Sequence, residues 1–189
     1  MSHPTHALPR LDPAQAALMV IDIQGKLAQS VVDADSLHRE AARMIEGARL
    51  FDLPVFWLEQ LPHKLGTTHP HVAAALHGLT PIAKQCFSAW GEPALRHALE
   101  ASQRRQILLI GMETHVCVWQ TALDLLDNGY RVWTINDAIS SRRADNRALG
   151  LARLAQAGAL PSSVEMALFE LQGQADDSPR FRRMIELVR

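Results

Sequence analysis

The sequence ILLIGMETHVCVWQ, residues 107–120, puts a cysteine at the point where a buried strand is expected to turn into a helix. An apolar run, residues 107–110, ends at Gly111, and Cys117 falls in the first turn of the amphipathic stretch that follows. The unpaired backbone N–H groups and the dipole of such a turn favour an anion, and a thiolate is one. We therefore expect Cys117 to have a depressed pKa and to act as a nucleophile.

Apolar runs of strand length alternate with helix-period segments on both sides of this stretch, as in a parallel sheet covered by helices on both faces. The strands are expected at residues 17–23, 55–58, 81–84, 107–110, 131–135 and 164–169. The helices are expected at residues 37–48, 92–102, 116–126, 144–157 and 179–188. The pattern predicts an α/β fold: a three-layer α/β/α sandwich around a mainly parallel, roughly six-stranded, Rossmann-like sheet.

Length and composition favour a single domain over residues 11–189, preceded by a flexible N-terminal tail, residues 1–10. The two cysteines, Cys86 and Cys117, are too few for a disulfide scaffold and favour a reducing, cytoplasmic setting. The net charge of -1 and the scattered basic residues give no footprint for nucleic acid or for an anionic membrane. No segment has the length of a membrane span or the apolar centre of a signal peptide. These observations favour a small-molecule substrate.

Chemically active side chains fall where the expected strands end. In an open parallel sheet ligands bind beyond the carboxyl ends of the strands, so these residues are expected to converge. They are Asp22, Glu59, Lys84, residues 111–117, and Asn136 with Asp137. A lone carboxylate or ammonium inside an apolar strand is costly to bury without a partner, so Asp22 and Lys84 are expected to serve each other or a substrate.

Residues 60–78 break the regular pattern with prolines and glycines and carry four histidines. A connection of this kind is expected to form a lid or a subunit contact. The pattern His69-Pro70-His71 is typical of a loop, and no carboxylate or cysteine nearby completes a set of metal ligands. We expect no metal site.

Three segments together resemble the isochorismatase-like cysteine hydrolases, a family that includes nicotinamidases and N-carbamoylsarcosine amidohydrolases. VIDIQ (20–24) resembles the aspartate strand of that family, AKQCFSAW (83–90) its lysine segment, and GMETHVCVWQTALDLLDNGYRV (111–132) its nucleophile segment. The likeness covers nearly the whole chain after the tail and is greatest to the isochorismatase domain-containing proteins.

The resemblance implies an Asp-Lys-Cys triad that cleaves a C–N bond of a small amide through a thioester, without a cofactor. Asp22 would be the general base, Lys84 its charge partner and Cys117 the nucleophile, with the amides of Glu113 and Cys117 as the oxyanion hole. It also implies a cis peptide bond at Met112–Glu113 and a homo-oligomer. The candidate substrate-pocket residues are Gln24, Glu59, Gln60, Thr114 and His115.

Metal-binding members such as nicotinamidases have Asp-x-His and a further His after the second strand, where this chain has Glu59-Gln60 and then His63. That difference argues against a catalytic metal and against nicotinamide as substrate. Alternatives are vinyl ether hydrolysis by an aspartate, against which the cysteine argues, and a non-catalytic, partner-binding descendant. A thiol redox sensor would need Cys86 as resolving residue, although Cys86 is expected to lie in the core. Arg142-Arg143 is either a solvated helix start or a guide for an anionic substrate.

Overall fold

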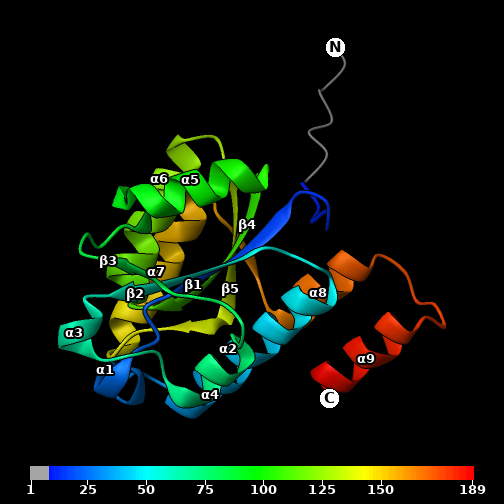
Figure 1. Ribbon diagram of the computed structural model, residues 1–189, viewed down its shortest axis with the longest axis horizontal. Helices are drawn as coiled ribbons and strands as arrows, with labels where there is room; N and C mark the ends of the chain where they lie inside the picture. Colours follow the sequence, from blue (N-terminus) through cyan, green and yellow to red (C-terminus); the bar gives the residue numbers. More distant parts are fainter. Residues whose placement is uncertain (1–8) are drawn as a thin grey trace.

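A computed structural model describes residues 9–189, and its centre is a six-stranded sheet in the order β3-β2-β1-β4-β5-β6 (Figure 1). All neighbouring strands of this sheet pair in parallel. The strands are β1 (Ala16–Ile21), β2 (Val55–Gln60), β3 (Ile82–Lys84), β4 (Gln106–Met112), β5 (Arg131–Ser140) and β6 (Leu160–Ser162). Because the chain order reverses between β1 and β4, a crevice is expected at the carboxyl ends of these two central strands.

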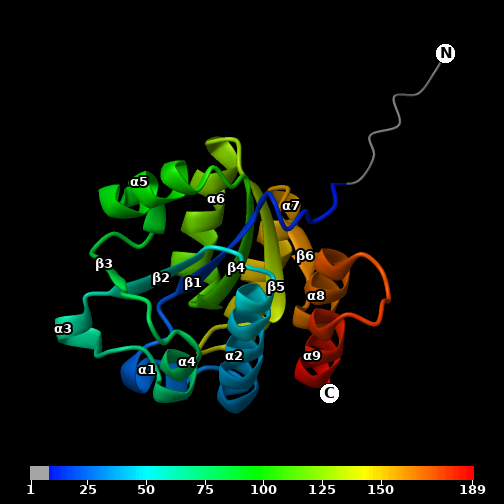
Figure 2. The ribbon, with the colours of Figure 1, turned by 45° about the vertical axis from the view of Figure 1, so that its right-hand side comes forward.

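Helices cover both faces of the sheet, with α2, α8 and α9 on one side and α5, α6 and α7 on the other (Figures 1 and 2). The helices are α1 (Gly25–Gln29), α2 (Ala34–Leu50), α3 (Pro62–Leu65), α4 (Pro70–Ala75), α5 (Pro93–Ser102), α6 (Trp119–Asp127), α7 (Ala144–Gln156), α8 (Val164–Gln172) and α9 (Pro179–Val188). Two short helical turns, η1 (Ala89–Gly91) and η2 (Thr114–Val118), complete the described elements. The predicted three-layer α/β sandwich is therefore confirmed.

Alternate residues of β1 supply the two cores on either side of the sheet. Leu18 and Val20 pack with the apolar faces of α2 and α8, whereas Met19 and Ile21 pack with α5 and α6. Every residue of β1 is buried, as is typical of a central parallel strand. The polar residue that follows this strand, Asp22, is likewise buried and needs partners inside the protein.

The predicted strand at residues 164–169 is wrong, because this segment is the first part of α8. Ser163 caps the helix by accepting a hydrogen bond from the backbone N–H of Met166. The buried residues Val164, Ala167, Leu168 and Leu171 follow helical spacing, and the sixth strand is the short segment before them, Leu160–Ser162. The other predicted strands and helices are present, with shifted ends.

Residues 1–8 of the expected flexible tail lie outside the described residues. At Arg10 the chain is already attached to the fold, because its carbonyl accepts a hydrogen bond of 2.8 Å from Gln106 Nε2.

Gly111, near the end of β4, lies against β1 in a way that excludes a side chain. Its φ is +133°, and a Cβ atom there would lie 2.1 Å from the carbonyl oxygen of Ile21. We expect Gly111→Ala to lower the free energy of unfolding by about 3 kcal/mol or more, through backbone strain and overpacking. Unfolding in urea measures this loss of stability.

Gly129→Ala is the matched control, because Gly129 also has a positive φ, +78°, but no atom lies within 4 Å of the position that a Cβ would take. Gly129→Ala should lower the free energy of unfolding by only about 1–2 kcal/mol. Equal losses in the two variants would contradict the close approach of β4 to β1.

Candidate active site

The carboxyl ends of three strands, β1, β3 and β4, bring Asp22, Lys84 and Cys117 to one edge of the sheet. Asp22 follows β1 directly, Lys84 is the last residue of β3, and Cys117 lies in η2, the π-helical turn after β4. Asp22 has a φ of +53°, a left-handed conformation that a non-glycine residue rarely adopts. Residues from three distant segments of the sequence thus meet, as expected from the strand ends.

The ammonium group of Lys84 is fully enclosed and lies between four oxygen acceptors. Its Nζ is 2.7 Å from Asp22 Oδ2 and 2.7 Å from Gln60 Oε1. The carbonyl oxygens of Phe87 and Cys86 lie at 3.1 and 3.3 Å. The residue is only 1% exposed, so the charge depends on these partners instead of on water. Removing one partner of such a buried pair typically costs about 3–5 kcal/mol.

The carboxyl group of Asp22 combines burial with one free oxygen. Burial raises its pKa above the ordinary value, and the charge and hydrogen bond of Lys84 oppose that effect. The Cys117 thiol approaches closely enough to lower the pKa as well. Within residues 9–189, Asp22 Oδ1 is buried without a hydrogen-bond partner. One oxygen therefore remains to accept a proton while the other holds Lys84.

The predicted depressed pKa of Cys117 is wrong. Burial raises the pKa of the thiol to about 12, and the negative charge of Asp22 adds to the rise, whereas Lys84 lowers it. Cys117 is 8% exposed, so loss of hydration outweighs the dipole of the helical turn on which the prediction rested. At neutral pH the resting side chain is a thiol, and a reaction at this sulfur needs a base.

The turn that carries Cys117 is held by backbone hydrogen bonds and by the end of β5. The Met112–Glu113 peptide bond is cis, at the position that the resemblance indicated. The carbonyl oxygen of Glu113 accepts hydrogen bonds from the amides of Val116 and Val118, at 3.0 and 3.2 Å. Thr114, fully buried, donates its amide to Ser141 Oγ at 3.0 Å. The amide of Thr114 is therefore already used inside the protein.

The side chains of Glu113 and His115 join this turn to the connection between β5 and α7. Glu113 Oε1 accepts a hydrogen bond of 2.6 Å from Arg142 Nε. The His115 ring lies between Ser141 Oγ and Asn146 Nδ2, each at 3.2 Å, and its Nδ1 is 3.4 Å from Glu113 Oε2. Arg142 is exposed but paired with Glu113, and this ion pair holds the turn that carries Cys117 from outside.

Gln24, Glu59 and Gln60 hold the connection after β2. Gln24 Oε1 accepts from the amide of Gln60 at 2.7 Å, and its Nε2 donates to the carbonyl of Gly66 at 2.6 Å. Glu59 Oε1 accepts from both the amide and the hydroxyl group of Thr68, at 2.7 and 2.8 Å. Of the three, Gln60 contacts Lys84 directly. The predicted pocket residues therefore shape the site mostly by anchoring residues 61–69.

Asn136 and Asp137 do not join the site, so that part of the predicted convergence is wrong. The register between β4 and β5 shifts, with Leu109 opposite Thr134 but Gly111 opposite Ile139. The Asp137 carboxylate instead accepts from the amide of Val164 at the start of α8, at 3.0 and 3.2 Å.

The extended β5 instead brings Ser141 and Arg142 to the turn that carries Cys117. Sequence reasoning missed Ser141. The run Ala138-Ile139-Ser140-Ser141 was the available signal, because it continues the apolar pattern of the strand to a polar end.

Three further expectations concern the surroundings of the site. Cys86 is exposed, so its predicted place in the core is wrong. Among residues 9–189, no group of three or more His, Cys, Asp or Glu side chains is arranged to hold a metal ion. In the same range no helix has both the length and the apolar character that crossing a membrane requires.

Known proteins resemble this chain in both sequence and fold. Residues 16–166 match the isochorismatase domain model. Isochorismatase domain-containing protein 2 of Bos taurus is 41% identical over 184 residues, which cover 97% of this chain and 87% of the relative. The secreted isochorismatase effector Isc1 of Phytophthora sojae (strain P6497) is 35% identical over 193 residues, covering 100% of this chain and 91% of the relative.

A solved structure, that of the MAR1 ribonuclease from Caenorhabditis elegans, superimposes with a TM-score of 0.88 at 34% identity. The superposition covers 95% of this chain and 92% of that one. Both the sequence match and the fold extend over the strands that carry Asp22, Lys84 and Cys117. The chain therefore belongs to the isochorismatase family.

Proposed function

We propose that this protein is a cysteine hydrolase that cleaves a C–N bond of a small, non-peptide amide through a thioester, using Asp22, Lys84 and Cys117. Family membership supports a hydrolase at the coarser level. The observation that carries the finer proposal is the buried Asp22 carboxyl group, which pairs with Lys84 through one oxygen and interacts with the Cys117 thiol. Asp22 thus pairs with Lys84 and lies near enough to Cys117 to raise the pKa of its thiol, which supports the roles of base, cation and nucleophile.

In the first half of the reaction, Asp22 takes the proton of the Cys117 thiol as the sulfur attacks the carbonyl carbon of the amide. Transfer during attack suits a thiol whose pKa is about 12, because a free thiolate would be scarce. The proton then passes to the leaving nitrogen as the C–N bond breaks, and ammonia or an amine departs. The acyl group remains on the sulfur as a thioester.

In the second half, Asp22 takes a proton from water, which attacks the thioester and releases the acid while the proton returns to the sulfur. Lys84 keeps Asp22 ionised between these steps. The negative oxygen formed in each attack needs donors, and the backbone amides of Glu113 and Cys117 are the candidates on this turn. Thr114 is not a candidate, since its amide already bonds Ser141.

Three rival functions have weaker support. Vinyl ether hydrolysis by Asp22 would give the nearby Cys117 thiol no role in the reaction. A redox sensor requires a thiolate, and the raised pKa of Cys117 opposes one. A non-catalytic, partner-binding protein has no need for a buried ion pair beside a sulfur atom.

We further propose that the protein is a cytoplasmic homo-oligomer. One relative, from Phytophthora sojae, is a secreted effector, so cell fractionation is the test of the location.

Cys117→Ala should abolish hydrolysis and leave the fold intact, because the residue only loses its sulfur atom. The assay is ammonia release from a panel of small amides, with the circular dichroism spectrum as check of folding. Cys86→Ala is the matched control, since Cys86 is the exposed cysteine. It should keep full activity. Undiminished turnover in Cys117→Ala would reject the mechanism.

Asp22→Asn should change hydrolysis and alkylation in opposite directions. Loss of the base should lower kcat by about 10²-fold or more. Loss of the negative charge should lower the pKa of Cys117, because Asp22 raises it while Lys84 remains. In a Cys86→Ala background, iodoacetamide should therefore label Cys117 faster when Asp22→Asn is present than when it is absent, at the same pH, from about pH 8 upward.

Mass spectrometry of the labelled peptide gives the rate against pH. Slower or unchanged labelling in the variant would show that Asp22 does not act on the sulfur, even if hydrolysis were lost. Opening of the site would also expose the buried Cys117 and speed its labelling, so the circular dichroism spectrum and the urea unfolding curve of Asp22→Asn must show that the fold is kept.

A further inference from the structure

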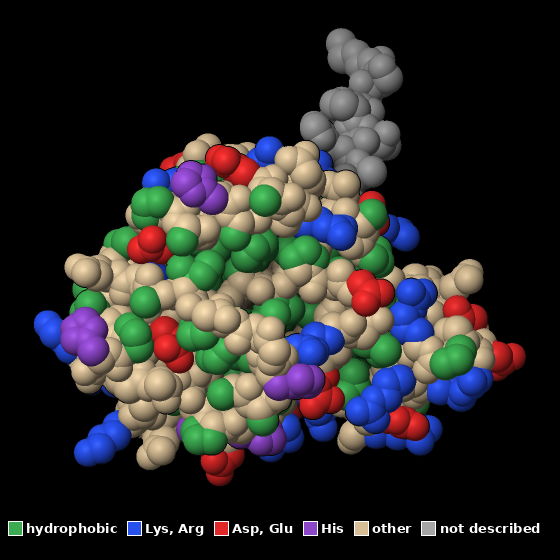
Figure 3. All heavy atoms as spheres, in the orientation of Figure 1, with side chains coloured by type: hydrophobic (Ala, Val, Ile, Leu, Met, Phe, Trp, Pro, Cys, Tyr) green, Lys and Arg blue, Asp and Glu red, His purple; other side chains and the backbone are tan. Residues whose placement is uncertain are grey.

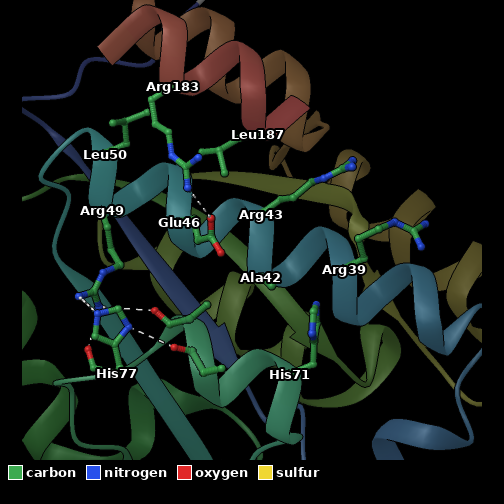
Figure 4. Close-up of a pocket in the computed structure, with 12 residues that line it drawn as sticks. Arg39, Ala42, Arg43, Glu46, Arg49, Leu50, His71, His77, Arg183 and Leu187 are labelled. Carbon is green, nitrogen blue, oxygen red and sulfur yellow. Dashed lines mark hydrogen bonds and ion pairs between the residues drawn. The ribbon is translucent and has the colours of Figure 1, made fainter. Parts of the chain in front are cut away.

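Four arginine side chains, Arg39, Arg43, Arg49 and Arg183, line an open hollow of about 620 Å³ between α2, α4 and α9, here called the arginine groove (Figure 4). Three of them follow one side of α2 at helical spacing and span about 15 Å, while Arg183 comes from α9 on the opposite wall. In the space-filling view, basic side chains gather over this part of the molecule, with acidic ones between them (Figure 3). Four basic residues that are scattered along the sequence thus meet on one surface.

We propose that the arginine groove binds a small organic phosphate, a ligand with one or more phosphoryl groups and an apolar or planar part. The volume of the arginine groove lies within the range of about 300–1,000 Å³ that is usual for small-molecule sites. The groove lies against α2, α4 and α9, so it is separate from the Asp22-Lys84-Cys117 site.

Arg49 carries the strongest part of this proposal because its charge is oriented but not neutralised. Its guanidinium group donates to the carbonyl oxygens of His77 and Ala75, at 3.0 and 3.5 Å, and lies 3.1 Å from His77 Nε2. Within the described part of the chain, no carboxylate forms an ion pair with it. A guanidinium held in place by neutral groups is prepared for an anion from outside.

Arg39 and Arg43 share a single carboxylate. Glu40 lies 3.3 Å from Arg39 and 3.1 Å from Arg43. One carboxylate is therefore shared by two guanidinium groups. The two arginines keep an excess of positive charge that an anionic ligand could neutralise.

Arg183 is balanced more fully than the other three. Its guanidinium group lies 2.9 Å from Glu186 on the same helix and 3.9 Å from Glu46 across the groove (Figure 4). Both pairs are open to water, so each holds Arg183 only weakly. The four arginines and these three glutamates, Glu40 included, leave an excess of one positive charge, in a chain whose net charge is -1. This local excess favours an anionic group.

The remaining lining explains why the ligand should be organic. Ala42, Leu50, Ala75 and Leu187 form apolar surface beside the guanidinium groups. Inorganic phosphate would leave that surface exposed to water, whereas a ring or hydrocarbon part would cover it. Arginine also offers its planar face to a ring.

The test is titration calorimetry of the full-length protein with ADP and with pyrophosphate in low salt. We expect both probes to bind, and ADP at least about fivefold more tightly, because only ADP covers the apolar surface. Arg49→Gln should weaken ADP binding about tenfold, and Arg183→Gln about threefold, because glutamates already share the charge of Arg183. Arg131→Gln, the same change at an exposed residue outside the groove, should have no effect.

Glu46→Gln gives a control of opposite sign, because Glu46 is the one carboxylate among the described residues that lines the groove. It should tighten ADP binding about threefold, an effect that misfolding cannot produce. The proposal is overturned if ADP does not bind at about 1 mM, a concentration at which even a weak small-molecule site fills. It is also overturned if neither arginine variant weakens binding, or if pyrophosphate binds as tightly as ADP.

A short single-stranded RNA serves as the last probe. If it binds about tenfold more tightly than ADP and is weakened by the same variants, the groove belongs to nucleic acid and the proposal is wrong.

Discussion

The ion pair between Lys84 and Asp22, 2.7 Å long and closed off from water, is the constraint on which the rest of the site depends. It links the ends of β3 and β1 across β2, whose last residue, Gln60, supplies a further acceptor for the ammonium group. Because both charges are buried, neither tolerates the loss of the other. The pair also sets the electrostatics at Cys117, where the carboxylate raises the pKa of the thiol and the ammonium lowers it.

Much of the fold could be predicted from the sequence because apolar runs of strand length and helical spacing alternate along it. The start of α8 at Val164 was predicted as a strand, because a short apolar run shows neither a helical nor a strand period. Only the N-cap at Ser163 distinguishes the two structures. The strand ends correctly predicted that Asp22, Lys84 and Cys117 come together. The same reasoning wrongly placed Asn136 and Asp137 at the site, because the local sequence pattern does not show the shifted register between β4 and β5.

The remaining errors come from burial, which a sequence shows only indirectly. The position of Cys117 in a helical turn predicts a low pKa, yet the actual value depends on how much water the surrounding strands exclude. Cys86 is two positions from Lys84 and so is expected on the same strand face, but the chain leaves the sheet directly after Lys84 and exposes it. The arginine groove is hidden from the sequence for a related reason, since α2 and α9 lie far apart along the chain and only packing joins their basic sides.

A thiol pKa of about 12 also affects how the protein would withstand oxidants. Peroxides and electrophiles attack the thiolate, and a raised thiol pKa keeps that form scarce at Cys117 at neutral pH. In the mechanism that we propose, Cys117 loses its proton only as it attacks the substrate, so it would be spared the damage that a permanently ionised cysteine suffers. In this chain, oxidative damage would fall first on the solvent-facing Cys86, which lies just beyond the end of β3 and takes no part in the proposed bond cleavage.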